Sequence, residues 1–139
     1  MKGTVRLQDL YEQYHEKVQF LSIYIREAHP VDGWWFGKGP MAWVMKRYSP
    51  RAATDVYDPQ TMAERRSVAG RCQETLQYGI PTLVDGMDDA VNKAYAGWPT
   101  RLYLIGLDGR VLYAAGKGPL GFKTAELAEA INSYTAINT

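Results

Sequence analysis

The sequence lacks the features that mark disulfides, cysteine metal clusters, membrane-spanning helices and strongly charged binding surfaces. Its 139 residues include one cysteine, which excludes an internal disulfide and a CxxC-type metal cluster, so we expect no metal site. No run of about 20 apolar residues occurs, so we expect no membrane-spanning helix. A net charge of +1 gives no electrostatic reason to expect nucleic acid or an acidic membrane as a partner. The polar start is unlike a signal peptide and the single cysteine fits a reducing compartment, so we expect a cytoplasmic protein.

What is present is typical of one globular domain. Hydrophobic residues make up 46% of the chain and charged residues 22%, which are ordinary values for a folded protein. The length is enough to bury a substantial core. We therefore expect residues 1–139 to form a single domain.

The periodicity of the apolar residues predicts helices and strands in alternation. The expected helices are Val5–Glu16, a helix from Pro59 to Tyr78 capped by Asp58, 88–97, and one that starts at Thr124. The expected strands are 18–25, 81–85, 101–106 and 110–114, the last two joined by the hairpin signal Asp108-Gly109. The stretch 27–57 is rich in glycine and proline and predicts a long, functional insertion.

This order is that of an α/β, thioredoxin-like sheet flanked by helices, but without the first central strand and the redox turn after it. We expect parallel strands at 18–25, 81–85 and 101–106, with 110–114 antiparallel to its neighbour. The absent strand would lie between 18–25 and 101–106. These two strands should therefore stand apart by one empty position, about 10 Å, or close up abnormally.

Four segments resemble the iodothyronine deiodinases and their bacterial relatives. The most specific is YIREAHPVDGW (24–34), which matches almost residue for residue the stretch after the family's second core strand. The others, in the family's order, are AERRSVAGRCQETL, TLVDGMDDAVNKAYAGWPTRLYLI and GRVLYAAGKGP. The resemblance implies reductive dehalogenation of a small aromatic substrate, with no bound cofactor and an external thiol as reductant. The resemblance is also compatible with a homodimer.

The family's nucleophile has no counterpart in this chain. The resemblance places it, as selenocysteine or cysteine followed by Pro-Pro-Phe, just ahead of the first helix, where this sequence begins with Met1-Lys2-Gly3. One explanation is a genuine loss. The other is a start assigned too late because an in-frame selenocysteine codon was read as a stop. We favour the second, because losing a central strand would leave backbone groups unpaired in the core.

Glu27 and His29 follow a buried strand at its carboxyl end, where open α/β sheets gather ligands. An imidazole can move protons near neutral pH, and a neighbouring carboxylate would orient it. The resemblance implies that both residues are catalytic and that Tyr24 contacts the substrate. An alternative is that His29, just before Pro30, caps the strand end through backbone hydrogen bonds.

Two further residues are candidates for substrate binding. Arg101 starts a strand beside the expected site, and the resemblance implies that it binds the anionic or phenolic end of the substrate. The alternative is that Arg101 is an ordinary surface arginine with no part in substrate binding. Trp34 could stack on an aromatic ring, or could join Trp35 and Trp43 in a satellite core that holds the insertion down.

Two residues bear on the choice between functions. Pro99 stands where thioredoxin-like proteins hold a cis-proline against the redox centre, and Pro59 stands about where vertebrate deiodinases carry a substrate-contacting histidine. Both features favour the alternative of a thiol peroxidase or thioredoxin-like oxidoreductase. A non-catalytic binding domain is the third hypothesis. Cys72 should lie with Val68 and Ala69 on the apolar side of its helix and act as a small hydrophobe.

Overall fold

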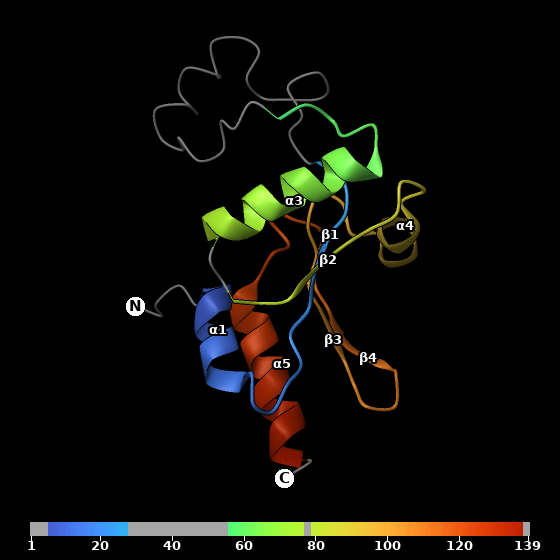
Figure 1. The fold of residues 1–139 in the computed structure, drawn as a ribbon. Helices are drawn as coiled ribbons and strands as arrows, with labels where there is room; N and C mark the ends of the chain where they lie inside the picture. The colour runs from blue at the N-terminus through green and yellow to red at the C-terminus, as the bar shows by residue number, and fades with distance from the viewer. Residues whose placement is uncertain (1–5, 28–55, 77–78, 138–139) are drawn as a thin grey trace, which may run out of the picture.

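The computed structural model describes residues 6–27, 56–76 and 79–137 and shows a mixed α/β fold (Figure 1). The helices are α1 (Leu7–Tyr14), α3 (Met62–Leu76), α4 (Ala90–Tyr95) and α5 (Thr124–Ile137). The strands are β1 (Ser22–Tyr24), β2 (Thr82–Val84), β3 (Tyr103–Ile105) and β4 (Val111–Ala114). The order of helices and strands along the chain agrees with the order predicted from periodicity.

The strands form two separate pairs. β1 and β2 are parallel, with Ile23 opposite Leu83, whereas β3 and β4 are antiparallel, with Tyr103 opposite Ala114. Both directions agree with the prediction. Within the described part of the chain no strand joins β1 to β3, so the expected break between these two strands is present.

The strands are shorter than predicted. The apolar run 18–25 predicted one strand, but only Ser22–Tyr24 pairs with β2. The apolar residues before that point serve the core instead, since Phe20 is buried and Val18 packs against the same cluster. An apolar run can thus lie partly outside a ladder and partly on the surface, where Leu21 is 51% exposed, a distinction that periodicity does not make.

Helix α3 begins at Met62 rather than Pro59, because Thr61 and not Asp58 caps it. The Glu64 backbone N–H donates to Thr61 Oγ1 at 3.2 Å, and the Glu64 carboxylate accepts from the Thr61 backbone N–H at 3.2 Å. This reciprocal pair is a capping box, which the sequence signals as Thr-x-x-Glu. The Asp58 carboxylate instead accepts a hydrogen bond from Arg26 at 2.9 Å.

The core is built where α1 and α5 meet the sheets. Its buried members are Leu10, Tyr14, Phe20, Ile80, Leu104, Leu127 and Ile131. The Tyr14 hydroxyl also donates to Asn132 Oδ1, which ties α1 directly to α5. In Figure 1 these two helices lie side by side below α3, which packs against β2. The residues just before β1 and β2 therefore share one core with β3, although these strands form no common ladder.

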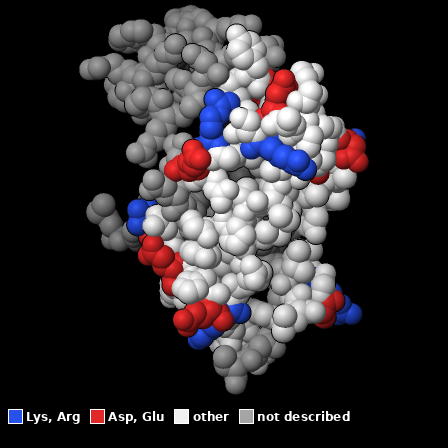
Figure 2. Space-filling model, in the orientation of Figure 1, with Lys and Arg blue, Asp and Glu red and all other residues white. Residues whose placement is uncertain are grey.

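On the face drawn in Figure 2, the described residues show no concentration of charge of one sign. Figure 2 shows acidic and basic side chains scattered and interspersed on the face that it draws, with an uncharged area between them. This agrees with the net charge of +1. Of the helices that the structure describes, none combines the length and apolar character needed to cross a bilayer.

The core assignment predicts unequal effects for the same substitution at two places on α5. Ile131 is 1% exposed and Ile137 is 83% exposed. We expect Ile131→Ala to lower the free energy of unfolding by about 2–5 kcal/mol, because it leaves a cavity among packed side chains. Ile137→Ala deletes the same atoms at an exposed position and should change the free energy of unfolding by less than about 0.5 kcal/mol. Urea denaturation measures both, and equal losses would contradict this core.

Candidate functional site

A cavity of about 240 Å³ lies along β1 beside α3. Its lining residues are Ser22, Ile23, Tyr24, Ile25, Arg26, Glu27, Ala69, Cys72, Gln73, Ile80, Thr82 and Pro99. Most of the wall is apolar, with polar groups at a few points, which is the usual composition of a small-molecule site. Since an apolar cavity of about 150 Å³ holds benzene, this volume is sufficient for one substituted aromatic ring.

The cavity follows the open edge of β1, because six consecutive residues of this strand and its extension line it. The Ser22 N–H donates to the Pro81 carbonyl at 2.9 Å, and the Asp85 N–H donates to the Tyr24 carbonyl at 2.8 Å. In a parallel ladder, alternate residues bond to the same neighbour, so the backbone groups of Ile23 and Ile25 face away from β2. The candidate site therefore lies at the edge where the sequence predicts an empty strand position.

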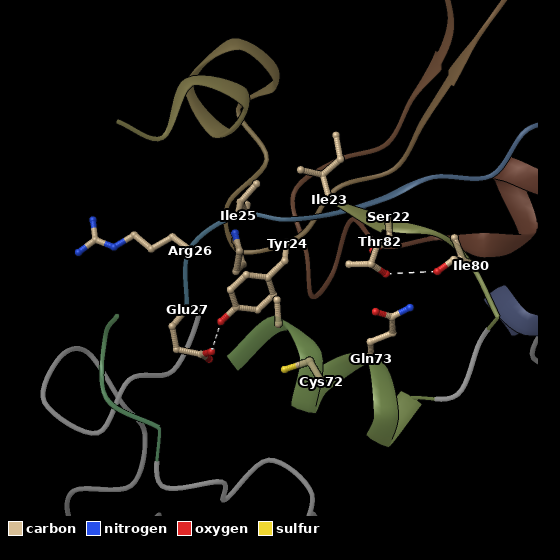
Figure 3. Close-up of a pocket in the computed structure, with 12 residues that line it drawn as sticks. Ser22, Ile23, Tyr24, Ile25, Arg26, Glu27, Cys72, Gln73, Ile80 and Thr82 are labelled. Carbon is tan, nitrogen blue, oxygen red and sulfur yellow. Dashed lines mark hydrogen bonds between the residues drawn. The ribbon is translucent and has the colours of Figure 1, made fainter. Parts of the chain in front are cut away.

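Tyr24 and Glu27 form the polar pair of the cavity. The Tyr24 hydroxyl donates to Glu27 Oε2 at 2.7 Å, and Figure 3 shows its ring projecting from β1 toward α3. Burial, followed by the hydrogen bond and negative charge of Glu27, raises the pKa of Tyr24 far above its usual value. Tyr24 therefore stays a neutral hydrogen-bond donor throughout the physiological range. The structure brings these two predicted site residues together.

Cys72 also faces the cavity, which differs from the expectation of a purely core position. Val68 and Ala69 are buried as predicted, but the Cys72 side chain is half-buried and points toward Tyr24 in Figure 3. The reason is that the cavity adjoins the apolar face of α3, so Ala69 and Cys72 both line it. Burial, and after it the charge of Glu27, raises the pKa of the Cys72 thiol. The group is therefore mainly protonated near neutral pH and a weak nucleophile.

Pro99 lines the cavity and follows Trp98, which contacts the end of β1. The Trp98–Pro99 peptide bond is cis, as the sequence position predicted. The Trp98 indole Nε1–H donates to the Glu27 carbonyl at 3.4 Å. The segment before β3 is thus in contact with the end of β1.

Arg101 lies apart from this group. Its Nε donates to the Ala115 carbonyl at 2.7 Å and its Nη1 to the Tyr95 carbonyl at 3.4 Å. The guanidinium also stacks 5.1 Å from the centroid of the Tyr103 ring. Arg101 is not among the residues that line the cavity. Its hydrogen bonds instead join the segment before β3 to the Ala115 and Tyr95 carbonyls. Its role in substrate binding stays a prediction.

The other sequence-predicted residues are not placed by the structure. His29 and Trp34 lie outside the described residues, as do Trp35 and Trp43. Their part in the site also stays a prediction. Among the described residues, no three His, Cys, Asp or Glu side chains come together in a way that could hold a metal ion.

Sequence reasoning missed two buried charged residues near the site, Arg65 and Asp85, each 3% exposed. Arg65 Nη1 donates to the Gly86 carbonyl at 2.6 Å and to Asp89 Oδ1 at 2.9 Å, which ties α3 to the loop after β2. Asp85 accepts backbone N–H groups at the start of α4, including that of Asn92 at 2.9 Å. The available signal was an aspartate between a strand and a short helix, a position that favours capping.

Comparison with known proteins agrees with the resemblance seen in the sequence. The family model described as iodothyronine deiodinase matches residues 3–135. Thyroxine 5-deiodinase of Aquarana catesbeiana is 35% identical over 130 residues, which cover 91% of this chain and 42% of that protein. The protein of the same name from Sparus aurata is 32% identical over 134 residues, or 96% of this chain and 45% of that protein. That of Ovis aries is 33% identical over 132 residues, or 91% and 38%.

The chain thus spans less than half the length of these relatives. The similarity nevertheless extends through the helices and strands that surround the cavity, since the family model covers them all. This chain belongs to the iodothyronine deiodinase family.

Proposed function

We propose that this chain forms the catalytic fold of a deiodinase-type reductive dehalogenase that acts on a small halogenated aromatic compound. The observation that carries the proposal is the Tyr24–Glu27 hydrogen bond in a cavity large enough for one substituted ring. Membership of the deiodinase family supports the reaction type. The relatives named as thyroxine 5-deiodinases are more than twice as long as this chain, so the proposal extends to the class of halogenated aromatic compounds and not to thyroxine.

The proposed nucleophile is a selenocysteine or cysteine upstream of this chain. A strand paired with the open edge of β1 would run about 4.8 Å from it. If parallel to β1, that strand would end beside Glu27, so the residue after it would reach the same end of the cavity. A chalcogen there would also lie near the start of α1, where the positive end of the helix dipole lowers its pKa.

In the proposed reaction, the chalcogenolate attacks the halogen of the ring and takes it as a formal cation. The electron pair of the carbon–halogen bond stays on the ring carbon, which receives a proton from His29 or Glu27. One external thiol then displaces halide from the chalcogen, and a second releases the enzyme as the disulfide of the two thiols forms. The aromatic carbon is reduced and the thiols are oxidised, so electrons balance without a bound cofactor.

Tyr24 has a supporting part in this scheme. Because its pKa is raised, its hydroxyl keeps donating to Glu27 while the carboxylate exchanges a proton. That hydrogen bond holds the carboxylate at the carboxyl end of β1. The proton would therefore be delivered at a fixed point of the cavity.

A thiol peroxidase or thioredoxin-like oxidoreductase is the second candidate. It is favoured by Pro99, which lines the cavity, and by Pro59 at the position of a substrate-contacting histidine in the vertebrate enzymes. It would use the same upstream nucleophile and external thiols, but with peroxide or a disulfide as substrate. The third candidate is a non-catalytic binding domain. It is tested by assaying residues 1–139 without any upstream extension.

The proposal predicts that residues 1–139 are inert and that an upstream extension restores activity. With a diiodophenol and dithiothreitol, the chain as given should release no iodide. A chain extended by a strand and a Cys or selenocysteine before Pro-Pro-Phe should release iodide, because it supplies the nucleophile. In that extended chain, His29→Ala should lower the rate at least about 100-fold, the usual contribution of general acid–base catalysis. Ion chromatography of iodide measures each rate.

The matched control is the extended chain with Ser in place of the nucleophile, which should be as inactive as residues 1–139. Peroxide consumption by the extended chain without iodide release would favour the second candidate. Iodide release by residues 1–139 that Cys72→Ser abolishes would overturn the proposal and make Cys72 the nucleophile.

The electrostatics of the cavity predict how Cys72 titrates. The negative charge of Glu27 disfavours the thiolate, so Glu27→Gln should lower the pKa of Cys72 toward its ordinary value. At about pH 8, iodoacetamide should then alkylate the variant faster than the wild type, because more of the thiol is ionised. Glu74→Gln is the control, since it removes a charge from an exposed position on α3 two residues from Cys72. A wild-type pH profile in Glu27→Gln would show that Glu27 does not act on the thiol.

A further inference from the structure

The segment Gly97–Pro99, which leads from α4 into β3, lies against the carboxyl end of β1. The Trp98 indole donates to the Glu27 carbonyl at 3.4 Å. A Cβ placed on Gly97 would come within 3.3 Å of Ile25 Cδ1, so the backbone passes close to the strand. Pro99 lines the cavity itself. Because β1 and β3 share no ladder in the described part of the chain, this segment joins the two sheets at the site.

Asn92, the third residue of α4, holds the segment in place. Its side-chain Oδ1 accepts the Trp98 backbone N–H at 2.9 Å, and its carbonyl accepts the Gly97 N–H at 3.1 Å. The Asn92 backbone N–H donates to Asp85 Oδ2 at 2.9 Å. One residue therefore connects the segment Gly97–Pro99 to α4 and to the end of β2.

The attachment at Asp85 is itself fixed. This carboxylate is 3% exposed and also accepts the backbone N–H groups of Gly86 at 2.8 Å and Val91 at 3.0 Å. Arg65, equally buried, donates to the Gly86 carbonyl at 2.6 Å and so ties the same loop to α3. The Asp85 carboxylate accepts three backbone N–H groups in all, so a different position of the loop would leave buried donors unpaired.

We propose that Asn92 is a positioning residue for the candidate site. Its side chain holds Trp98 and Pro99 against the end of β1, which fixes the backbone of Glu27 and the position of Pro99 in the cavity wall. The effect on catalysis rests on the proposed function, whereas the positioning itself does not. A residue that only capped α4 would affect stability and leave the cavity unchanged, and this difference can be measured.

The first measurement is hydrogen exchange of the Trp98 backbone amide, followed by NMR in three variants of residues 1–139. Asn92→Ala removes the acceptor and should speed exchange roughly three- to tenfold, the range that one net hydrogen bond supports. Asn92→Asp keeps an oxygen at the same place and should restore exchange to near the wild-type rate. Lys93→Ala, on the same helix, loses a bond from the Lys93 ammonium to the Asp88 carbonyl in the turn before α4 and should leave Trp98 unchanged.

The second measurement reports on the cavity. The charged groups that act on the Cys72 thiol are Glu27, from the end of β1, and Arg71 on α3, with the neutral Tyr24 phenol beside them. If Asn92→Ala releases Trp98, the end of β1 loosens and water reaches the cavity. The pH profile for alkylation of Cys72 should then move to lower pH, while Asn92→Asp and Lys93→Ala keep the wild-type profile.

Trp98→Phe provides a second route if Asn92→Ala fails to fold. It removes the indole donor to Glu27 and leaves α4 intact, so the Cys72 profile should move in the same direction. Unchanged Trp98 exchange in folded Asn92→Ala would overturn the proposal. An unchanged Cys72 profile in both Asn92→Ala and Trp98→Phe would overturn it as well. Neither readout involves turnover, so an extended chain that releases no iodide would count against the proposed function alone.

Discussion

The packing of α1 against α5 is the constraint on which the rest of the structure depends. These helices bury Leu10 and Ile131 and bring together Phe20, before β1, with Leu104 of β3. Since β1 and β3 have no common ladder among the described residues, side-chain packing aligns the two strand pairs. That packing includes Phe20 and Ile80, just before β1 and β2, whereas the cavity extends along β1 as far as Glu27. The carboxyl end of β1 lies beyond this core and therefore depends on other contacts.

The same burial that defines the cavity determines which of its groups can react. It raises the pKa of Tyr24 and of the Cys72 thiol, and the charge of Glu27 adds to both effects. A cavity that disfavours negative charge suits a neutral phenol that orients a carboxylate. It does not suit a thiolate on α3, far from any helix terminus that could stabilise the anion. The environment of Cys72 is thus a physical reason to look for the nucleophile elsewhere, at the start of a helix.

The sequence predicts the order of elements and names Tyr24 and Glu27 as residues of one site, because both depend on local spacing, although it does not predict the hydrogen bond between them. Periodicity fixes which segments are helices and strands, and residues 24 and 27 follow one another at the end of a single strand. Contacts across the fold were not predictable in this way. The Trp98–Asn92 bond depends on how α4 turns into the next segment, and the exposure of Cys72 to the cavity depends on how much of α3 the short sheet covers. The start of α3 is different, since the sequence carries two competing capping signals, Asp58-Pro59 and Thr61–Glu64, and the helix uses the second.

The open edge of β1 and the segment Gly97–Pro99 line different parts of the same cavity. Along the open edge, the wall of the cavity is strand backbone. A strand that paired with this edge would therefore fill the part of the cavity beside Ile23. The part that would remain lies at the carboxyl end, between Glu27 and Pro99. On the proposed function, this is where an aromatic ring and the nucleophile would meet. The bonds from Asp85 through Asn92 to Trp98 hold this end even while the edge is open, because Asp85 follows β2 and Asn92 lies on α4. The geometry of the reacting end is thus supported from β2 and α4, independently of whatever completes the sheet.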